Sequence, residues 1–205
     1  MDTLRFGSGT PGALLLHGYG ADGHDLAPIA PMLPGTVLVP SAADATPYGG
    51  RQWWSLDDAK PLRAMSAADA VLEDHPDLAR ATTRIHGLVD ELPEGPVLLA
   101  GFSQGAMLSL AAGLTDPRVG AIVAMSGALT RDAAAAALVT SPRRILVAHG
   151  RQDPTVPYAA GEAAAALLAE AGHDVAFLPF DGGHGIPPQV LDALIAEARR
   201  LAPQA

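Results

Sequence analysis

The sequence predicts an α/β fold in which a mostly parallel central sheet is covered by helices on both faces. The chain has 205 residues, enough to bury a sizeable core and too few for two comfortable domains, so residues 1–205 are expected to form a single domain. Short apolar runs alternate with longer amphipathic segments along it. Strands that alternate with helices through short connections form parallel sheets, and this alternation sets the fold class.

Six short runs are almost continuously hydrophobic, which is typical of strands buried on both faces. These predicted strands span residues 13–18, 36–42, 96–103, 120–127, 143–150 and 173–180.

The segments between these strands have the length and patterning of helices. The predicted helices span residues 25–33, 66–92 with a break at Pro76, 104–114, 158–171 and 188–201, and the alanine run 133–138 is expected to form a helical turn.

Composition and charge exclude several classes of function. The formal net charge of −9 argues against nucleic acid or an anionic membrane as the main partner, because both require a basic surface. The absence of cysteine excludes disulfides, thiolate metal sites and a cysteine nucleophile. The N-terminus lacks the pattern of a signal peptide, and no apolar run approaches the roughly 18 residues that span a bilayer. We therefore expect a cytoplasmic protein without stable membrane association.

The stretch "LAGFSQGAML" places Ser103 at the abrupt end of an apolar run and directly before a predicted helix. This is the strand, sharp turn and helix context of a G-x-S-x-G nucleophile elbow. Gly101 and Gly105 would remove the Cβ atoms that clash in such a turn, leaving the Ser103 Oγ exposed on a strained backbone. Because the pattern is common, a serine that only caps the following helix is the alternative.

Two further polar residues follow the ends of predicted strands. Asp153 follows the strand that ends at residue 150, and His184 follows the strand that ends at residue 180. A serine hydroxyl needs a base and a group that orients the base, and the chain order Ser, Asp, His is that of α/β-hydrolases. Taken alone, Asp153 could be a turn residue and His184 a surface histidine. Asp181 is the fallback for the orienting acid.

An oxyanion formed by attack on a carbonyl usually binds two backbone N–H groups. Gln104, the residue after the serine, should supply one, and Tyr19 in the glycine-rich loop after an early strand should supply the other. Four side chains near that loop could instead be imagined as a metal site, but their spacing matches no zinc pattern, so we expect no metal and no cofactor. They are His17, Asp22, His24 and Asp25.

Other polar residues have simpler explanations. Ser126 ends a strand but lacks the first glycine of an elbow, so it is expected to line the site without attacking. His149 is expected to brace the loop that presents Asp153. The remaining histidines are expected to be surface residues; they are His75, His86 and His173.

The connection 43–65 is longer than the ~12–15 residues usual for loops in compact domains, which favours a functional role. Its apolar side chains Trp53, Trp54, Leu56 and Met65 are the candidate substrate contacts. The alternative for the two tryptophans is that they only pin the loop to the body of the domain.

Six ordered motifs together resemble the phospholipase/carboxylesterase family, which includes acyl-protein thioesterases and small bacterial carboxylesterases. The motifs are "LLLHGYGADG", "RQWW", "GFSQGAM", "MSGAL", "HGRQDPTVP" and "GGHGIP". The resemblance implies the α/β-hydrolase fold without a separate cap domain. It also implies a catalytic triad of Ser103, Asp153 and His184, oxyanion donors at Tyr19 and Gln104, and a possible homodimer.

Two departures from the family pattern stand out. Many relatives have two glycines after the glutamine, whereas this chain has Gly105 and Ala106. Relatives often place an acid directly after the Trp-aromatic pair, whereas Ser55 and Leu56 come before Asp57 here. The second departure concerns the substrate contacts of the loop 43–65.

The function predicted from the residues and the resemblance together is hydrolysis of a small carboxylic ester of short to medium acyl length, or of an acyl thioester, through an acyl-enzyme. Alternatives on the same fold are a lysophospholipase, a dienelactone-hydrolase-like activity or a peptidase-like activity. A non-catalytic binding protein on a hydrolase scaffold is the alternative from another class.

Overall fold

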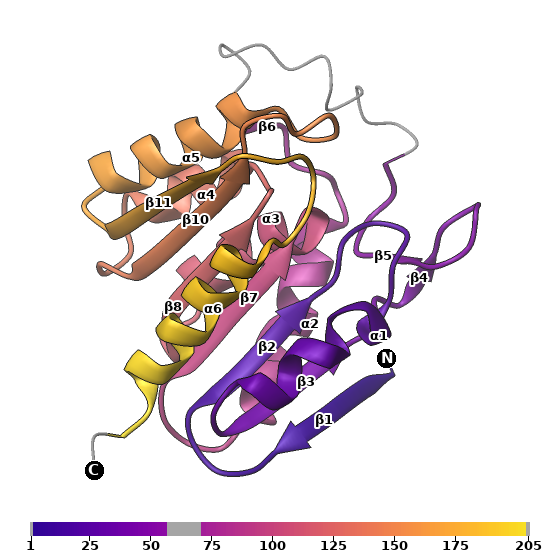
Figure 1. The fold of residues 1–205 in the computed structure, drawn as a ribbon, viewed down its shortest axis with the longest axis vertical. Helices are drawn as coiled ribbons and strands as arrows, with labels where there is room; N and C mark the ends of the chain where they lie inside the picture. The colour runs from indigo at the N-terminus through magenta and orange to yellow at the C-terminus, as the bar shows by residue number, and fades with distance from the viewer. Residues whose placement is uncertain (1, 57–70, 204–205) are drawn as a thin grey trace.

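A seven-stranded sheet lies at the centre of the computed structural model, which describes residues 2–56 and 71–203 (Figure 1). All neighbouring strands are parallel except the pair at one edge, β1 and β3, and this confirms the predicted fold class. In spatial order the strands are β1 (Thr3–Gly7), β3 (Thr36–Pro40), β2 (Gly12–Leu16), β7 (Val97–Phe102), β8 (Val119–Met125), β10 (Arg144–Gly150) and β11 (Asp174–Phe180).

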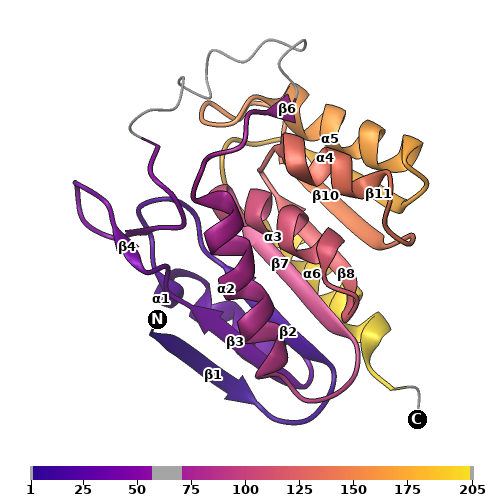
Figure 2. The same cartoon turned by 180° about the vertical axis from the view of Figure 1, so that it is seen from behind.

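Helices cover both faces of the sheet. One face carries α1 (Gly23–Leu26), the 3₁₀ helix η1 (Ala27–Met32) and α6 (Pro188–Leu201). The other face, seen in Figure 2, carries α2 (Leu78–Asp90), α3 (Gln104–Thr115), α4 (Arg131–Ala137) and α5 (Tyr158–Glu170). None of the helices in the described segments is both long enough and apolar enough to cross a membrane.

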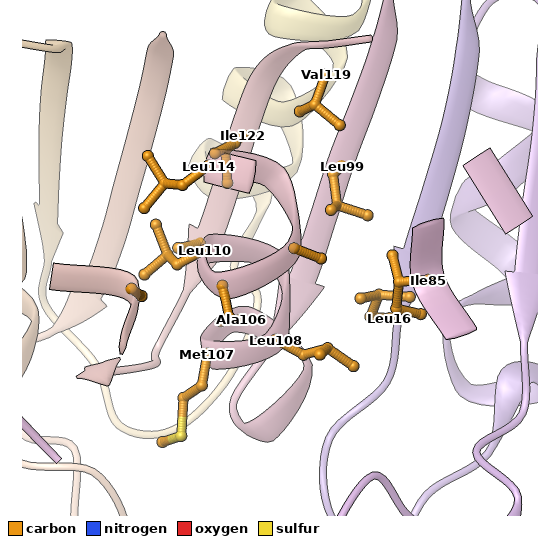
Figure 3. Close-up of a cluster of buried hydrophobic side chains, with 14 of the residues drawn as sticks. Leu16, Ile85, Leu99, Ala106, Met107, Leu108, Leu110, Leu114, Val119 and Ile122 are labelled. Atoms are coloured by element: carbon orange, nitrogen blue, oxygen red, sulfur yellow. The ribbon is translucent and has the colours of Figure 1, made fainter. Parts of the chain in front are cut away.

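The core consists of two apolar layers, one on each side of the sheet. Successive residues of a strand point to opposite faces, so Leu99 of β7 packs toward α3 while Leu98 packs toward α6. Helix α3 is buried along nearly its whole length, and Figure 3 shows its Leu108 beside Leu16 of β2 and Ile85 of α2. A helix that is apolar all round belongs in the interior, and this position brings its N-terminus against the sheet edge where the strands end.

The ends of three central strands are tied to their neighbours. The N–H of Ser103, directly after β7, donates to Met125 O at the end of β8 (2.9 Å), and the N–H of Ser126 donates to Ala148 O in β10 (2.8 Å). The N–H of Arg151, after β10, donates to the last residue of β11 (2.9 Å). The first turn after each of these strands therefore continues the hydrogen bonding of the sheet.

Several elements differ from the sequence-based expectation. Strand β1 was not predicted, and the predicted helix 25–33 is one α-helical turn followed by η1, which contains Pro31. The predicted helix 66–92 begins only at Leu78, after the expected break at Pro76. Before that break, β6 (Val71–Leu72) pairs with β9 (Leu129–Thr130), and residues 66–70 lie outside the described part of the chain. A short hairpin, β4 (Asp44–Ala45) and β5 (Arg51–Gln52), starts the connection 43–65.

Candidate active site

Ser103 occupies the predicted elbow between β7 and α3. Its φ of 55° and ψ of −116° lie in a region that side-chain-bearing residues rarely adopt. A Cβ on Gly101 would overlap the carbonyl oxygen of Gly105, and a Cβ on Gly105 would overlap that of Leu16, so only glycine allows this close approach. Ser103 itself is 8% exposed, which makes it more enclosed than predicted.

Asp153 and His184 meet beside this elbow. His184 Nδ1 lies 2.7 Å from Asp153 Oδ2, and the His184 ring lies against the ring of Phe102, with 4.6 Å between the two centroids. Phe102 directly precedes Ser103 in the chain. The structure therefore pairs His184 with Asp153 and places the His184 ring against the residue that precedes Ser103.

Backbone donors hold the Asp153 carboxylate in place. Asp153 Oδ1 accepts hydrogen bonds from the N–H groups of Thr155 (2.8 Å) and Val156 (2.9 Å). Burial acts to raise the pKa of Asp153, but hydrogen bonds from His149, His184 and these two N–H groups outweigh it and hold the pKa well below its ordinary value. The group facing the His184 imidazole is therefore a carboxylate anion.

The fallback acid, Asp181, has a different partner. Its side chain is 91% exposed, and its Oδ1 lies 3.7 Å from Arg151 Nε. The orienting contact of His184 is made by Asp153.

The two candidate oxyanion donors flank the serine. Gln104 follows Ser103 and begins α3. A Cβ on Gly18 would lie 3.3 Å from Ser103 Cβ, so the peptide that joins Gly18 to Tyr19 borders the serine. Both predicted donors thus belong to backbone next to Ser103.

Trp53 and Trp54 are pinned against the elbow. The Gln104 side chain accepts a hydrogen bond from Trp53 N–H (3.0 Å) and donates one to Trp54 O (2.8 Å). Trp53 is 3% exposed and Trp54 is 5% exposed, which favours the pinning alternative for both. Leu56 is half-buried against the core, and Met65 lies outside the described residues.

Two further residues, His149 and Ser126, were predicted to support the site. The bracing role expected of His149 is confirmed, because its buried Nε2 donates to Val156 O (3.0 Å) and lies 3.5 Å from Asp153 Oδ2. Ser126 is fully buried at a φ of 52°, directly after β8.

The expectation for His173 was wrong. This residue is 6% exposed, accepts a hydrogen bond from Arg143 N–H and donates one to Ala137 O, both at 3.0 Å. An imidazole can satisfy one donor and one acceptor of the main chain, and this allows it to be buried between α4 and β10. His75 and His86 are half-buried.

Two contributions to the site were missed in the sequence. The Gln104 side chain, described above, joins the elbow to Trp53 and Trp54. His17, considered only as a metal ligand, is fully buried at the end of β2, and its ring nitrogens contact the main chain of Gly18 and Ala42. A polar residue that ends a fully apolar strand is the signal that could have pointed to it. Within the described segments, no group of three or more His, Asp or Glu side chains is arranged to hold a metal.

Comparisons with known proteins identify the family of this chain. The model of the Phospholipase/Carboxylesterase family matches residues 10–198. Acyl-protein thioesterase 1 of Gibberella zeae is 38% identical over 114 residues, which cover 52% of this chain and 48% of that protein. Esterase YpfH of Escherichia coli K12 is 28% identical over 200 residues, covering 93% of this chain and 83% of that protein.

Solved structures show the same fold. The crystal structure of esterase PE8 matches with a TM-score of 0.82 at 26% identity, covering 98% of this chain and 99% of that chain. The crystal structure of SOBER1 from Arabidopsis thaliana matches with a TM-score of 0.73 at 25% identity, covering 92% of this chain and 97% of that chain. The matches to the first curated thioesterases span about half of those relatives' length, whereas the family match runs through nearly all of this chain. The chain belongs to the phospholipase/carboxylesterase family.

Proposed function

We propose that this protein is an ester-bond hydrolase that cleaves carboxylic esters or acyl thioesters through an acyl-enzyme on Ser103. The observation that carries the proposal is the 2.7 Å contact between His184 Nδ1 and Asp153 Oδ2 beside a serine held at positive φ. Family membership supports the same reaction class, as do relatives named esterase and acyl-protein thioesterase.

The first half of the reaction forms the acyl-enzyme. Because Asp153 accepts the Nδ1 proton of His184, Nε2 carries the lone pair and acts as the base. It takes the proton of Ser103 as Oγ bonds to the carbonyl carbon, and the N–H groups of Tyr19 and Gln104 stabilise the resulting oxyanion. His184 then gives its proton to the leaving alcohol or thiol, and the ester or thioester bond breaks.

Water completes the reaction. His184 takes a proton from the water as its oxygen attacks the acyl carbon, and Ser103 Oγ leaves and recovers the proton. The carboxylic acid is released, and the proton that Ser103 lost to the leaving alcohol or thiol is replaced by one from the water. No step draws on a cofactor.

The substrate proposed is a small ester or thioester with a short to medium acyl chain. The cytoplasmic location, the absence of nucleic-acid and stable membrane partners, and the possible homodimer stay predictions. The lysophospholipase and dienelactone-hydrolase-like alternatives share the same machinery and differ only in the substrate.

The test is a hydrolysis screen over p-nitrophenyl esters, acyl-CoAs and lysophospholipids, with Ser103→Ala as the control. We expect the wild type to hydrolyse members of the first two groups and Ser103→Ala to lose activity by about 10³-fold or more without loss of folding. A fluorophosphonate should label the wild type only. Labelling that persists in Ser103→Ala would place the nucleophile elsewhere, and a wild type that is inert toward all three groups would contradict the function.

A further inference from the structure

His17 follows the last residue of β2 and is fully buried, at a point where the neighbouring strand residues are leucines. It lies directly before Gly18, whose backbone borders Ser103. Burying an imidazole costs free energy unless its two nitrogens find partners, so those partners indicate what the ring does there.

The hydrogen bonds of the ring fix its tautomer. The N–H of Ala42 donates to His17 Nε2 (3.0 Å), so Nε2 must carry a lone pair. The proton of the neutral ring is then on Nδ1, which donates to Gly18 O (2.7 Å). Burial lowers the pKa of His17, which favours this neutral form. A protonated ring would turn a second donor toward the N–H of Ala42.

The carbonyl that receives the Nδ1 proton belongs to the same peptide unit as the N–H of Tyr19. A trans peptide is planar, and its C=O and N–H point in opposite directions, so holding the oxygen also aims the N–H. A second hydrogen bond to Gly18 O, from the N–H of Ala21, is longer at 3.3 Å. The His17 contact is the tighter of these two constraints on the direction of the Tyr19 N–H.

The ring is held in turn by Trp53. The two rings are stacked at a tilt of 30° with 5.0 Å between centroids, and Trp53 Nε1 donates to His17 O (2.9 Å). The main-chain N–H of Trp53 is bound by the Gln104 side chain. The backbone segments that carry the two proposed oxyanion donors, at Tyr19 and Gln104, are therefore linked through one tryptophan.

We infer that His17 is a positioning residue for the oxyanion hole, whose Nδ1–H fixes the peptide between Gly18 and Tyr19 in the direction that stabilises the transition state. The inference rests on the proposed function, since it assigns His17 a role in the same acyl transfer. His17 touches neither the substrate nor the reacting atoms.

Two substitutions separate the functions of the two ring nitrogens. The amide of Asn reaches the position of Nδ1, so His17→Asn can still donate to Gly18 O but leaves the N–H of Ala42 without its acceptor. The amide of Gln reaches the position of Nε2, so His17→Gln can still accept from Ala42 but loses the donor to Gly18. The two variants therefore serve as matched controls, because each loses one buried hydrogen bond.

We expect His17→Gln to lower kcat by about tenfold with KM nearly unchanged, whereas His17→Asn keeps most of kcat. The expected loss is smaller than the loss caused by removing an oxyanion donor outright, because the Tyr19 N–H is misdirected and not removed. A trifluoromethyl ketone, whose adduct with Ser103 places an oxyanion in the hole, should bind His17→Gln about tenfold more weakly than the wild type. Equal kcat and equal inhibitor affinity in the two variants would overturn the inference.

A measurement on the wild type covers the case in which neither variant folds. Long-range ¹H–¹⁵N correlation of the histidine rings should show His17 as the Nδ1–H tautomer. An Nε2–H tautomer would overturn the inference. A wild type that neither hydrolyses esters nor reacts with a fluorophosphonate would overturn the proposed function and this inference together, whereas an active wild type with a fully active His17→Gln would overturn the inference alone.

Discussion

The carboxylate of Asp153 accepts three hydrogen bonds of 2.7 to 2.9 Å from His184 Nδ1 and the N–H groups of Thr155 and Val156. Each donor needs an acceptor, and a buried carboxylate can serve all three at once. An amide in the same place would turn its NH₂ toward at least one of these donors. The role of this residue therefore depends on its charge and not only on its shape.

We predict that Asp153→Asn lowers kcat/KM by about 10³-fold or more, because the His184 ring loses the acceptor that fixes its tautomer. The matched control is Asp181→Asn, which removes the same charge from the neighbouring loop at a side chain that is 91% exposed. The control should retain activity near that of the wild type in a p-nitrophenyl ester assay. A larger loss in the control than in Asp153→Asn would reverse the assignment of the acid.

The pH dependence of kcat/KM should show one ionisation on the acid side. The pKa of Asp153 is held below its ordinary value, so this group is an anion throughout the pH range of the assay. The only other ionisation that the mechanism requires is the one that makes the general base neutral. The logarithm of kcat/KM should therefore rise with a slope of about one and then level off. Initial rates measured in a series of buffers of different pH test this. A slope near two would mean that a second group titrates with the imidazole.

At the scale of the elements, the contact between α3 and the end of β2 depends on the absence of a side chain. The carbonyl oxygen of Leu16 occupies the place that a Cβ on Gly105 would take, and neither backbone can move without displacing the buried helix. The glycine that shapes the elbow thus also sets how closely the helix approaches the sheet.

Gly105→Ala should lower the free energy of unfolding by about 3 kcal/mol and reduce activity, because the overlap is with main-chain atoms. Gly87→Ala is the matched control: this glycine lies in α2, is exposed, and a Cβ added to it would meet no atom within 4 Å. There the substitution should stabilise the protein by about 1 kcal/mol through helix propensity. Urea unfolding followed by circular dichroism compares the two. Similar stabilities in both variants would show that the helix can shift away from the sheet.

The elements that the sequence predicted well are those whose pattern reflects burial. The strands β7, β8 and β10 are buried on both faces, and continuous apolar runs of this length are typical of such strands. Strand β1 was missed because its five residues, all half-buried or exposed, form no continuous apolar run, unlike the other edge strand, β11. Its short, partly polar sequence carries too little pattern to mark it as a strand.

The residues of the candidate site likewise divide into those that the sequence predicts and those that it does not. The proposed triad of Ser103, Asp153 and His184 could be named from the sequence because chemistry restricts which residue types can follow those strands, and the contact between His184 and Asp153 is the part that the structure shows. The burial of His173 and the contacts of His17 could not be predicted, because each depends on carbonyl and N–H groups that come from distant parts of the chain. The sequence around a residue does not indicate which distant main-chain N–H and C=O groups will need a hydrogen-bond partner.

At the scale of the whole molecule, the connection 43–65 is the segment expected to cover the elbow, and its described part begins with the β4–β5 hairpin that extends from the body in Figure 1. With Trp53 and Trp54 already buried against the elbow, little of their surface is left for an acyl chain. The binding surface for the acyl group is therefore expected to be short.

We predict that kcat/KM rises over short acyl chains, peaks at short to medium length and falls for long ones. Each CH₂ that is buried contributes about 0.8 kcal/mol, and the gain ends when the chain outgrows the surface that covers it. A series of p-nitrophenyl esters from acetate to palmitate, assayed below and above the critical micelle concentration, measures this. A steady rise to palmitate, or a jump in rate at micelle formation, would indicate a deep lipid-binding tunnel.

The hydrogen bonds that tie each strand end to its neighbour have a consequence for amide exchange. The N–H groups of Ser103, Ser126 and Arg151 lie in turns, where exchange with solvent deuterium is usually fast, yet each donates to a neighbouring strand. Their protons can exchange only when that pairing opens, so we expect them to exchange more slowly than other amides in turns. The main chain of Ser103 is thus held by the sheet, and we expect local fluctuations of the surrounding loops to leave its backbone geometry unchanged.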